Sequence, residues 1–262
     1  MDFPFDVLDS IFGFLKSHPD SLVASSKAHP ILSQAIERHL YYHVRFRTCS
    51  ESSPHGIAGY TLEPSHLIKL LTKTPHLVNY IRILQIDFRD FISLNQETSQ
   101  ILQHITSVLP MFSMLECMIL VAPSDFISWK QLPLAFRTAV ENCLRLSTLQ
   151  RLHVGELDFP LSILEKNVNI NCFSLSGYPK IPDCSDDTNL QLTALSFDGI
   201  NFTPPFTNFT TWAKRHITNL QSLKCNYSDE KIILELLEVC SDTLNRLDLL
   251  LELPCELSSC FS

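Results

Sequence analysis

Histidine and cysteine are the residues of this chain whose types and spacing could do chemistry. His39 and His43 lie four residues apart on a predicted helix, which is the spacing of two ligands of one metal ion. No third ligand accompanies them, so we interpret both as exposed or capping residues. Cys143 and Cys172 are candidate nucleophiles, but both lie in apolar periodic stretches, which is typical of small buried side chains.

The short motifs that organise common catalytic sites are absent from the sequence. It contains no Gly-x-Ser-x-Gly elbow, no His-Glu-x-x-His zinc motif and no Gly-x-x-x-x-Gly-Lys phosphate loop. The acidic segment 183–187 lacks the alternating ligands, the glycine and the final glutamate of an EF-hand. We therefore expect no enzymatic activity, no metal and no cofactor. A Cys- or His-dependent hydrolase is the alternative, and it requires a pocket in which a Cys or Ser is hydrogen-bonded to a His.

Composition and charge restrict the class of partner. The 262 residues include 20 Lys and Arg against 28 Asp and Glu, and no basic run is present, so we expect no nucleic-acid partner. No apolar stretch approaches the roughly 18 to 20 residues that cross a bilayer. The N-terminus is acidic where a secretory signal is basic, and the nine Cys form no C-x-x-C pair. These features predict a cytoplasmic or nuclear chain without a membrane partner.

The elements that must carry any site are set by one repeated pattern. A hexad with apolar residues at its first, fourth and sixth positions occurs seven times. The hexads start at Ile81, Leu115, Leu149, Ile170, Leu192, Leu220 and Leu244. The fourth and sixth residues alternate on a short strand and point into the core, whereas the residue between them faces outward. Helical periodicity precedes several hexads, in segments 101–109, 136–144, 209–217 and 232–240.

Repeated strand and helix predict a solenoid, because one unit cannot bury its apolar face alone. The hexads resemble the leucine-rich repeat family, although their starts are 21 to 34 residues apart and the family's usual Asn or Cys is missing. The resemblance implies a surface that binds another protein. The candidate target-binding residues are the outward ones of the strands, namely Gln85, His153, Ser174, Ser196, Lys224 and Asp248. The alternative is that the hexads arise by chance in a Leu-rich chain or mark strands of another α/β fold.

The first 47 residues predict a small helical module. Apolar residues recur at helical spacing from Val7 to Leu15, a second helix is predicted near Ser21 to Lys27, and a third at about Ile31 to Val44. Three short helices bury too little surface to be stable alone, so the module needs a partner surface.

This module resembles the F-box family, whose motif begins with Leu-Pro, continues with a hydrophobic helix ending in Leu, and resumes with a Leu-rich second helix. The residues that match it in order are Phe3, Pro4, Val7, Leu8, Ile11, Leu15 and Leu22. Phe3 replaces the usual Leu, and the family's common Trp is absent. The resemblance implies that the seven residues bind a Skp-type linker protein and, through it, a cullin.

Together the two resemblances imply a substrate-recognition adaptor of an SCF-type (Skp–cullin–F-box) ubiquitin ligase. The repeats would hold an unidentified target protein, and other subunits would transfer ubiquitin, so that this chain acts by proximity. One alternative is a leucine-rich-repeat scaffold with a vestigial F-box and no ligase role. Another is that the helices are an N-terminal cap that shields the open end of the solenoid.

The predicted fold is α/β: an irregular leucine-rich-repeat-like solenoid, with a parallel sheet and outer helices, preceded by a three-helix F-box-like module. We expect the module at 1–47, a linker and first helix at 48–76, and the solenoid at 77–262. The apolar tail 250–262 follows the last hexad. It either folds over the last repeat or marks a shortened version of a longer array.

Overall fold

The computed structural model describes residues 5–15, 18–46, 60–62, 64–88, 96–122, 128–176, 190–198, 207–226 and 230–249. The strands are β1 His43–Phe46, β2 Tyr60–Leu62, β3 Ile83–Asp87, β4 Cys117–Val121, β5 Arg151–Gly155, β6 Cys172–Ser176, β7 Ala194–Asp198, β8 Ser222–Asn226 and β9 Arg246–Leu249. The α-helices are α1 Phe5–Phe14, α2 Pro19–Ser26, α3 Pro30–Leu40, α4 Pro64–Lys73, α5 Gln96–Val108, α6 Leu134–Leu144, α7 Thr207–His216 and α8 Glu230–Cys240. The short 3-10 helices are η1 Pro75–Tyr80, η2 Leu109–Met111, η3 Trp129–Gln131 and η4 Leu161–Lys166.

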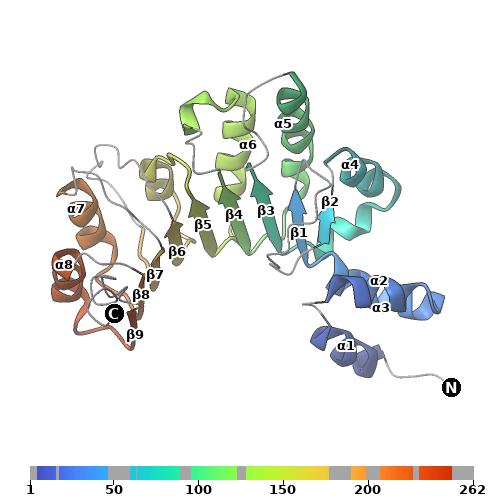
Figure 1. Cartoon of the computed structure of the whole chain (residues 1–262), viewed down its shortest axis with the longest axis horizontal. Coiled ribbons are helices and arrows are strands. Elements are labelled where there is room, and N and C mark those ends of the chain that lie inside the picture. The colour runs from blue at the N-terminus through green and yellow to red at the C-terminus, as the bar shows by residue number, and fades with distance from the viewer. Residues whose placement is uncertain are drawn as a thin grey trace, which may run out of the picture.

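The described strands form one all-parallel sheet in the order β2-β1-β3-β4-β5-β6-β7-β8-β9. Figure 1 shows this sheet as an arch, with α4 to α8 on its outer side and the inner side of the strands facing the hollow. Such an α/β arrangement is solenoid-like, because helices return the chain over the outer side between successive strands from β2 to β6 and from β7 to β9. No helix in the described part of the chain is long and apolar enough to cross a membrane.

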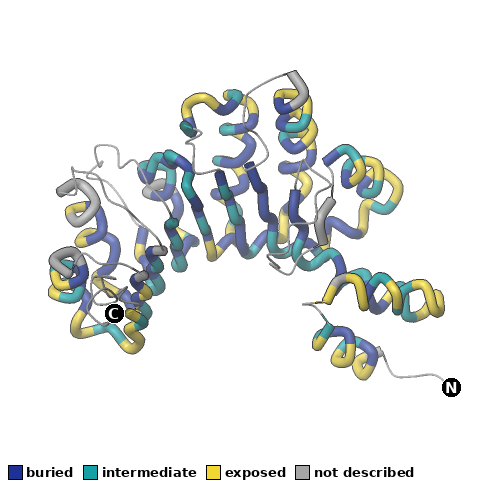
Figure 2. The backbone as a smooth tube through the Cα atoms, in the orientation of Figure 1, coloured by how far each residue is buried: buried dark blue, intermediate teal, exposed yellow. Residues whose placement is uncertain are grey.

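All seven hexads contribute a strand that starts at the hexad's third residue. Their fourth and sixth residues stand in register along the sheet, as Leu84 does with Met118 and Ile86 with Leu120. In the first six hexads these side chains are buried, whereas Leu247 and Leu249 of the seventh are 41% and 40% exposed. Figure 2 shows the resulting band of buried residues along the strands. The hexads therefore predict the strands, their register and the core face correctly.

The predicted helical segments supply the other half of this core. Each segment contributes buried apolar residues to the core, as Ile105 does on α5 and Val140 on α6. On α7, Trp212 meets Phe173 of β6 edge to face, with ring centroids 6.1 Å apart. Fully burying one large apolar side chain contributes about 1.5–3 kcal/mol, so this interface is what holds the helices to the sheet.

The three predicted N-terminal helices are present as α1, α2 and α3, and they have a core of their own. The prediction that the third helix reaches Val44 is wrong, because α3 ends at Leu40 and His43–Phe46 form β1. Strand β1 pairs with β3 on one side and β2 on the other, so the sheet begins well before residue 77.

Candidate protein-binding surfaces

Helix α1 has apolar side chains on two faces. Leu8 and Phe12, four residues apart, are buried in the core of the N-terminal module. Val7, Ile11 and Phe14 follow the i, i+4, i+7 spacing of a second face and are 44%, 47% and 85% exposed. We call these three residues the α1 apolar face. Three large exposed apolar side chains on one short helix make this face a candidate contact surface.

The seven predicted linker-binding residues are divided by the structure. Phe3 and Pro4 lie outside the described residues. Val7 and Ile11 are accessible, whereas Leu8 and Leu22 are buried in the module's own core and Leu15 is packed against it. Sequence reasoning did not single out the exposed Phe14 or Ile31 as candidates, although the helical spacing from Ile11 pointed to Phe14.

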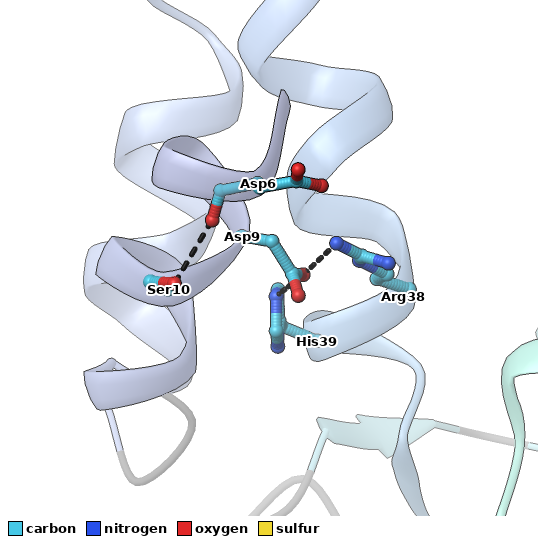
Figure 3. Close-up of polar contacts among 5 residues, drawn as sticks. All are labelled: Asp6, Asp9, Ser10, Arg38 and His39. Atoms are coloured by element: carbon cyan, nitrogen blue, oxygen red, sulfur yellow. Dashed lines mark hydrogen bonds and ion pairs between the residues drawn. The ribbon is translucent and has the colours of Figure 1, made fainter. Parts of the chain in front are cut away.

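A polar contact fixes α1 against α3. One carboxylate oxygen of Asp9 is hydrogen-bonded to His39 Nε2 and forms an ion pair with Arg38 (Figure 3). His39 is 8% exposed, so this contact provides a charged acceptor for a ring that is largely withdrawn from water. The prediction that His39 and His43 lie on one helix is wrong, because His43 begins β1. Asp9 thereby sets the orientation in which α1 presents its apolar face.

The second candidate surface is the inner side of the sheet. Pairing brings the predicted target-binding residues into one row, in which Gln85 and His153 flank Ile119 and the row continues through β6 to β9. His153, Ser174, Ser196 and Asp248 are partly exposed and Lys224 is exposed, so these five are accessible. The sequence thus predicted correctly that these positions face away from the core.

Gln85 is the exception, because it is fully buried although it faces inward. Its neighbours explain part of this burial. Arg45, its partner in register on β1, reaches past it to Asp87, with 2.5 Å between Nη2 and Oδ2. Neither atom of the Gln85 amide has a hydrogen-bond partner among the described residues. Gln85 is therefore not accessible in this structure, and its contact with a target stays a prediction. On the inner side of β1 and β3, Arg45, Gln85 and Asp87 are buried.

Over β5 to β8 the inner face is open and carries positive charge. Arg151 and Lys224 are exposed, and His153 shares a hydrogen bond of 2.9 Å between its Nδ1 and the Ser174 hydroxyl. Between them, β6 and β7 contribute only small side chains to the first two inner rows, namely Cys172, Ser174, Ala194 and Ser196. On β9, Arg246 is paired with Asp248 at 2.8 Å.

The cysteines considered as nucleophiles are held in their protonated form. Burial raises the pKa of the Cys143 thiol to about 12. Burial also raises the pKa of Cys172, and nearby Arg151 opposes that rise in part. Since the thiolate is the nucleophile, these environments work against nucleophilic chemistry.

The described residues contain no group of three or more His, Cys, Asp or Glu side chains that could hold a metal ion. Two accessible surfaces are present in the described part of the chain, the α1 apolar face and the inner side of the sheet over β5 to β8. In comparisons with known proteins, neither a protein-family model nor a curated protein matches the chain.

Proposed function

We propose that this chain is a substrate-recognition adaptor of an SCF-type ubiquitin ligase. Helices α1 to α3 bind a Skp-type linker, and the leucine-rich-repeat-like array holds a target protein. The observation that carries the proposal is the α1 apolar face, which coincides with the part of the sequence that resembles the F-box motif. The all-parallel sheet, with a strand at each hexad, supports the second half of the proposal.

The α1 apolar face is large enough to contribute to binding. Burying a large apolar side chain contributes about 1.5–3 kcal/mol, so three partly exposed ones supply on the order of 5 kcal/mol before the costs of association. Micromolar affinity corresponds to about −8 kcal/mol. Further contacts must therefore come from neighbouring residues, and Ile31 at the start of α3, 56% exposed, is one candidate.

The test is binding of the full chain to a purified Skp-type linker by calorimetry or co-elution. Wild type should bind, and Ile11→Asp combined with Phe14→Asp should weaken binding at least about 10-fold, because charged groups would be buried at the contact. Both positions are exposed, so the helices should keep their fold. Leu8→Asp is unsuited, since Leu8 belongs to the module's own core.

The matched control replaces Leu134 and Leu234 with Asp. They lie on α6 and α8, are 69% and 52% exposed, and undergo the same chemical change far from α1 in the sequence. Linker affinity should be unchanged in this control. Equal loss in both double variants, or no binding by wild type, would contradict the adaptor proposal.

The second candidate function is a repeat scaffold with a vestigial F-box. The burial of Leu8 and Leu22 favours it, because two residues that the resemblance assigns to the linker are occupied within the chain. In that case the wild type does not bind the linker, whereas target binding through the sheet is retained by the Ile11 and Phe14 double variant.

A further inference from the structure

We propose that the inner face of the sheet over β5 to β8 binds an extended acidic segment of a protein, anchored by Arg151 and Lys224. The inference deepens the proposed function, since it rests on the array being the part that holds a target. It specifies the chemistry of that target: two carboxylates on an extended chain. It does not depend on whether the N-terminal helices bind a linker.

The location follows from how much of the inner face is accessible. Over β1 and β3 the side chains of Arg45, Gln85 and Asp87 are 6%, 0% and 1% exposed, and Arg45 is already neutralised by Asp87. From β5 onward the face opens, and Arg151 and Lys224 are both exposed. Among the described residues, the exposed cations that a partner along the inner face can reach therefore lie from β5 onward.

The charge of the inner face over β5 to β8 determines the charge expected of its partner. The chain carries a formal net charge of −8, so a positively charged surface on it is opposite in sign to the chain as a whole. Arg151 and Lys224 form no ion pair within the described part of the chain, whereas Arg246 on the neighbouring β9 is paired with Asp248. Asp198 ends β7 and is in register with Asn226, two residues after Lys224 on β8. The Asp198 side chain lies outside the described residues. The two unpaired cations are complementary to carboxylates.

The sheet surface between Arg151 and Lys224 carries small side chains, which leave room for a polypeptide backbone. Cys172, Ser174, Ala194 and Ser196 are small and partly exposed, and the serine hydroxyls can donate or accept hydrogen bonds. Adjacent strands are about 4.8 Å apart, so the three steps from β5 to β8 span roughly 14 Å. An extended chain rises about 3.3 Å per residue, which places matching acidic side chains about four to five residues apart.

Nucleic acid fits this surface less well than an acidic protein segment. Binding a nucleic acid without base recognition depends on neutralising several successive phosphates. Among the described residues of this face, two unpaired cations are present, one on β5 and one on β8, and the net charge of the chain repels a polyanion.

The test is fluorescence anisotropy of the full chain with labelled peptides. Each peptide carries two Glu in an otherwise Ser and Ala background, and the distance between the two Glu is varied. The tightest binding should occur at a separation of about four to five residues and should weaken as salt is raised. Arg151→Glu combined with Lys224→Glu should weaken binding about 10-fold or more, because both contacts become repulsive.

Arg145→Glu combined with Lys73→Glu is the matched control. Both residues are exposed: Arg145 follows α6 and Lys73 ends α4, two helices on the outer side of the sheet. This variant has the same change in net charge as the Arg151 and Lys224 double variant. The control should bind as wild type does. The Arg151 and Lys224 double variant should in turn gain affinity for a peptide in which the two Glu are replaced by Lys, which also demonstrates that it is folded.

Three results would overturn the inference. They are absence of peptide binding by wild type, equal loss in the control, and binding of single-stranded RNA as tight as that of the best peptide. Linker binding is measured separately on the same proteins. A chain that binds the linker but no acidic peptide contradicts the inference alone, and a chain that binds the peptide but no linker contradicts only the ligase role.

Discussion

Gln85 is the residue at which polarity and burial conflict most clearly. Its amide is fully buried, and neither its oxygen nor its nitrogen has a hydrogen-bond partner among the described residues. A buried polar group in that condition costs about 1–3 kcal/mol. An apolar residue of similar size would keep the packing and remove this cost.

We therefore expect Gln85→Leu to raise the free energy of unfolding by about 1–2 kcal/mol. The measurement is the urea midpoint of full-chain unfolding. Gln103→Leu on α5 is the control, because Gln103 is exposed and the same change there should stay within about 0.5 kcal/mol of wild type. A less stable Gln85→Leu chain would mean that the amide is hydrogen-bonded in solution.

At the scale of the element, successive strands show what a following repeat contributes. Leu223 on β8 and Leu247 on β9 are in register and occupy the same hexad position. Leu223 is fully buried, whereas Leu247 is 41% exposed, because β9 is the last strand of the described sheet. The same residue type thus has two environments that differ chiefly in the presence of a neighbouring repeat.

Leu223→Ala should destabilise the chain by about 2–5 kcal/mol, since it removes a fully buried side chain and leaves a cavity. Leu247→Ala should cost less than about 1 kcal/mol, because water already reaches that side chain. Chemical unfolding of the two variants gives the comparison. Equal losses would show that β9 is covered in solution, by another part of the chain or by a second molecule.

Most of the sheet was predictable because the hexad is a local pattern with one structural outcome. Strands β1 and β2 were missed although their sequences carry the same spacing. Tyr41, Val44 and Phe46 occupy hexad positions one, four and six, as do Ile57, Tyr60 and Leu62. Tyrosine at an apolar position hid the signal, and the spacing of Leu40 and Val44 also fits a helix. Pairing with β3 decides between the two structures.

The accessibility of individual side chains was less predictable than the elements. Val7 and Leu8 are adjacent apolar residues at helical positions, yet only Leu8 faces the core. Which of the two is buried depends on how α1 is oriented against α3, and Asp9 contributes to that orientation through contacts with residues far along the sequence. Gln85 similarly follows the alternation of its strand, and its burial is explained in part by the Arg45 side chain beside it.

At the scale of the whole molecule, the two cores are connected rather than separate. Tyr41 packs against both the core of the N-terminal module and that of the sheet. Glu37 on α3 pairs with His76 on η1 at 3.2 Å, and β1 continues directly from the module into the sheet. A partner bound at α1 is therefore held in a defined position relative to the sheet, which is what an adaptor that acts by proximity requires.

Buried thiols are distributed through the larger core, and they predict how the whole chain responds to alkali. Burial raises the pKa of Cys117 to about 11 and the pKa values of Cys143 and Cys225 to about 12. In the unfolded chain a thiol has a pKa of about 8.5. At a pH between the thiol pKa of the unfolded chain and the raised pKa values of the folded chain, the folded chain binds more protons than the unfolded chain. The free energy of unfolding therefore falls as pH rises.

The contribution of these thiols should be fully retained below about pH 8 and lost progressively above about pH 9. Each thiol contributes at most about 1.4 kcal/mol per pH unit. Urea midpoints of wild type and Cys143→Ala, measured from neutral pH to about pH 10.5, separate this effect from the titration of Lys and Tyr, which both chains share. The variant should be less stable at neutral pH, because it lacks a buried side chain, but its stability should decline less steeply. Parallel declines would show that the Cys143 thiol ionises as readily in the folded chain as in the unfolded one.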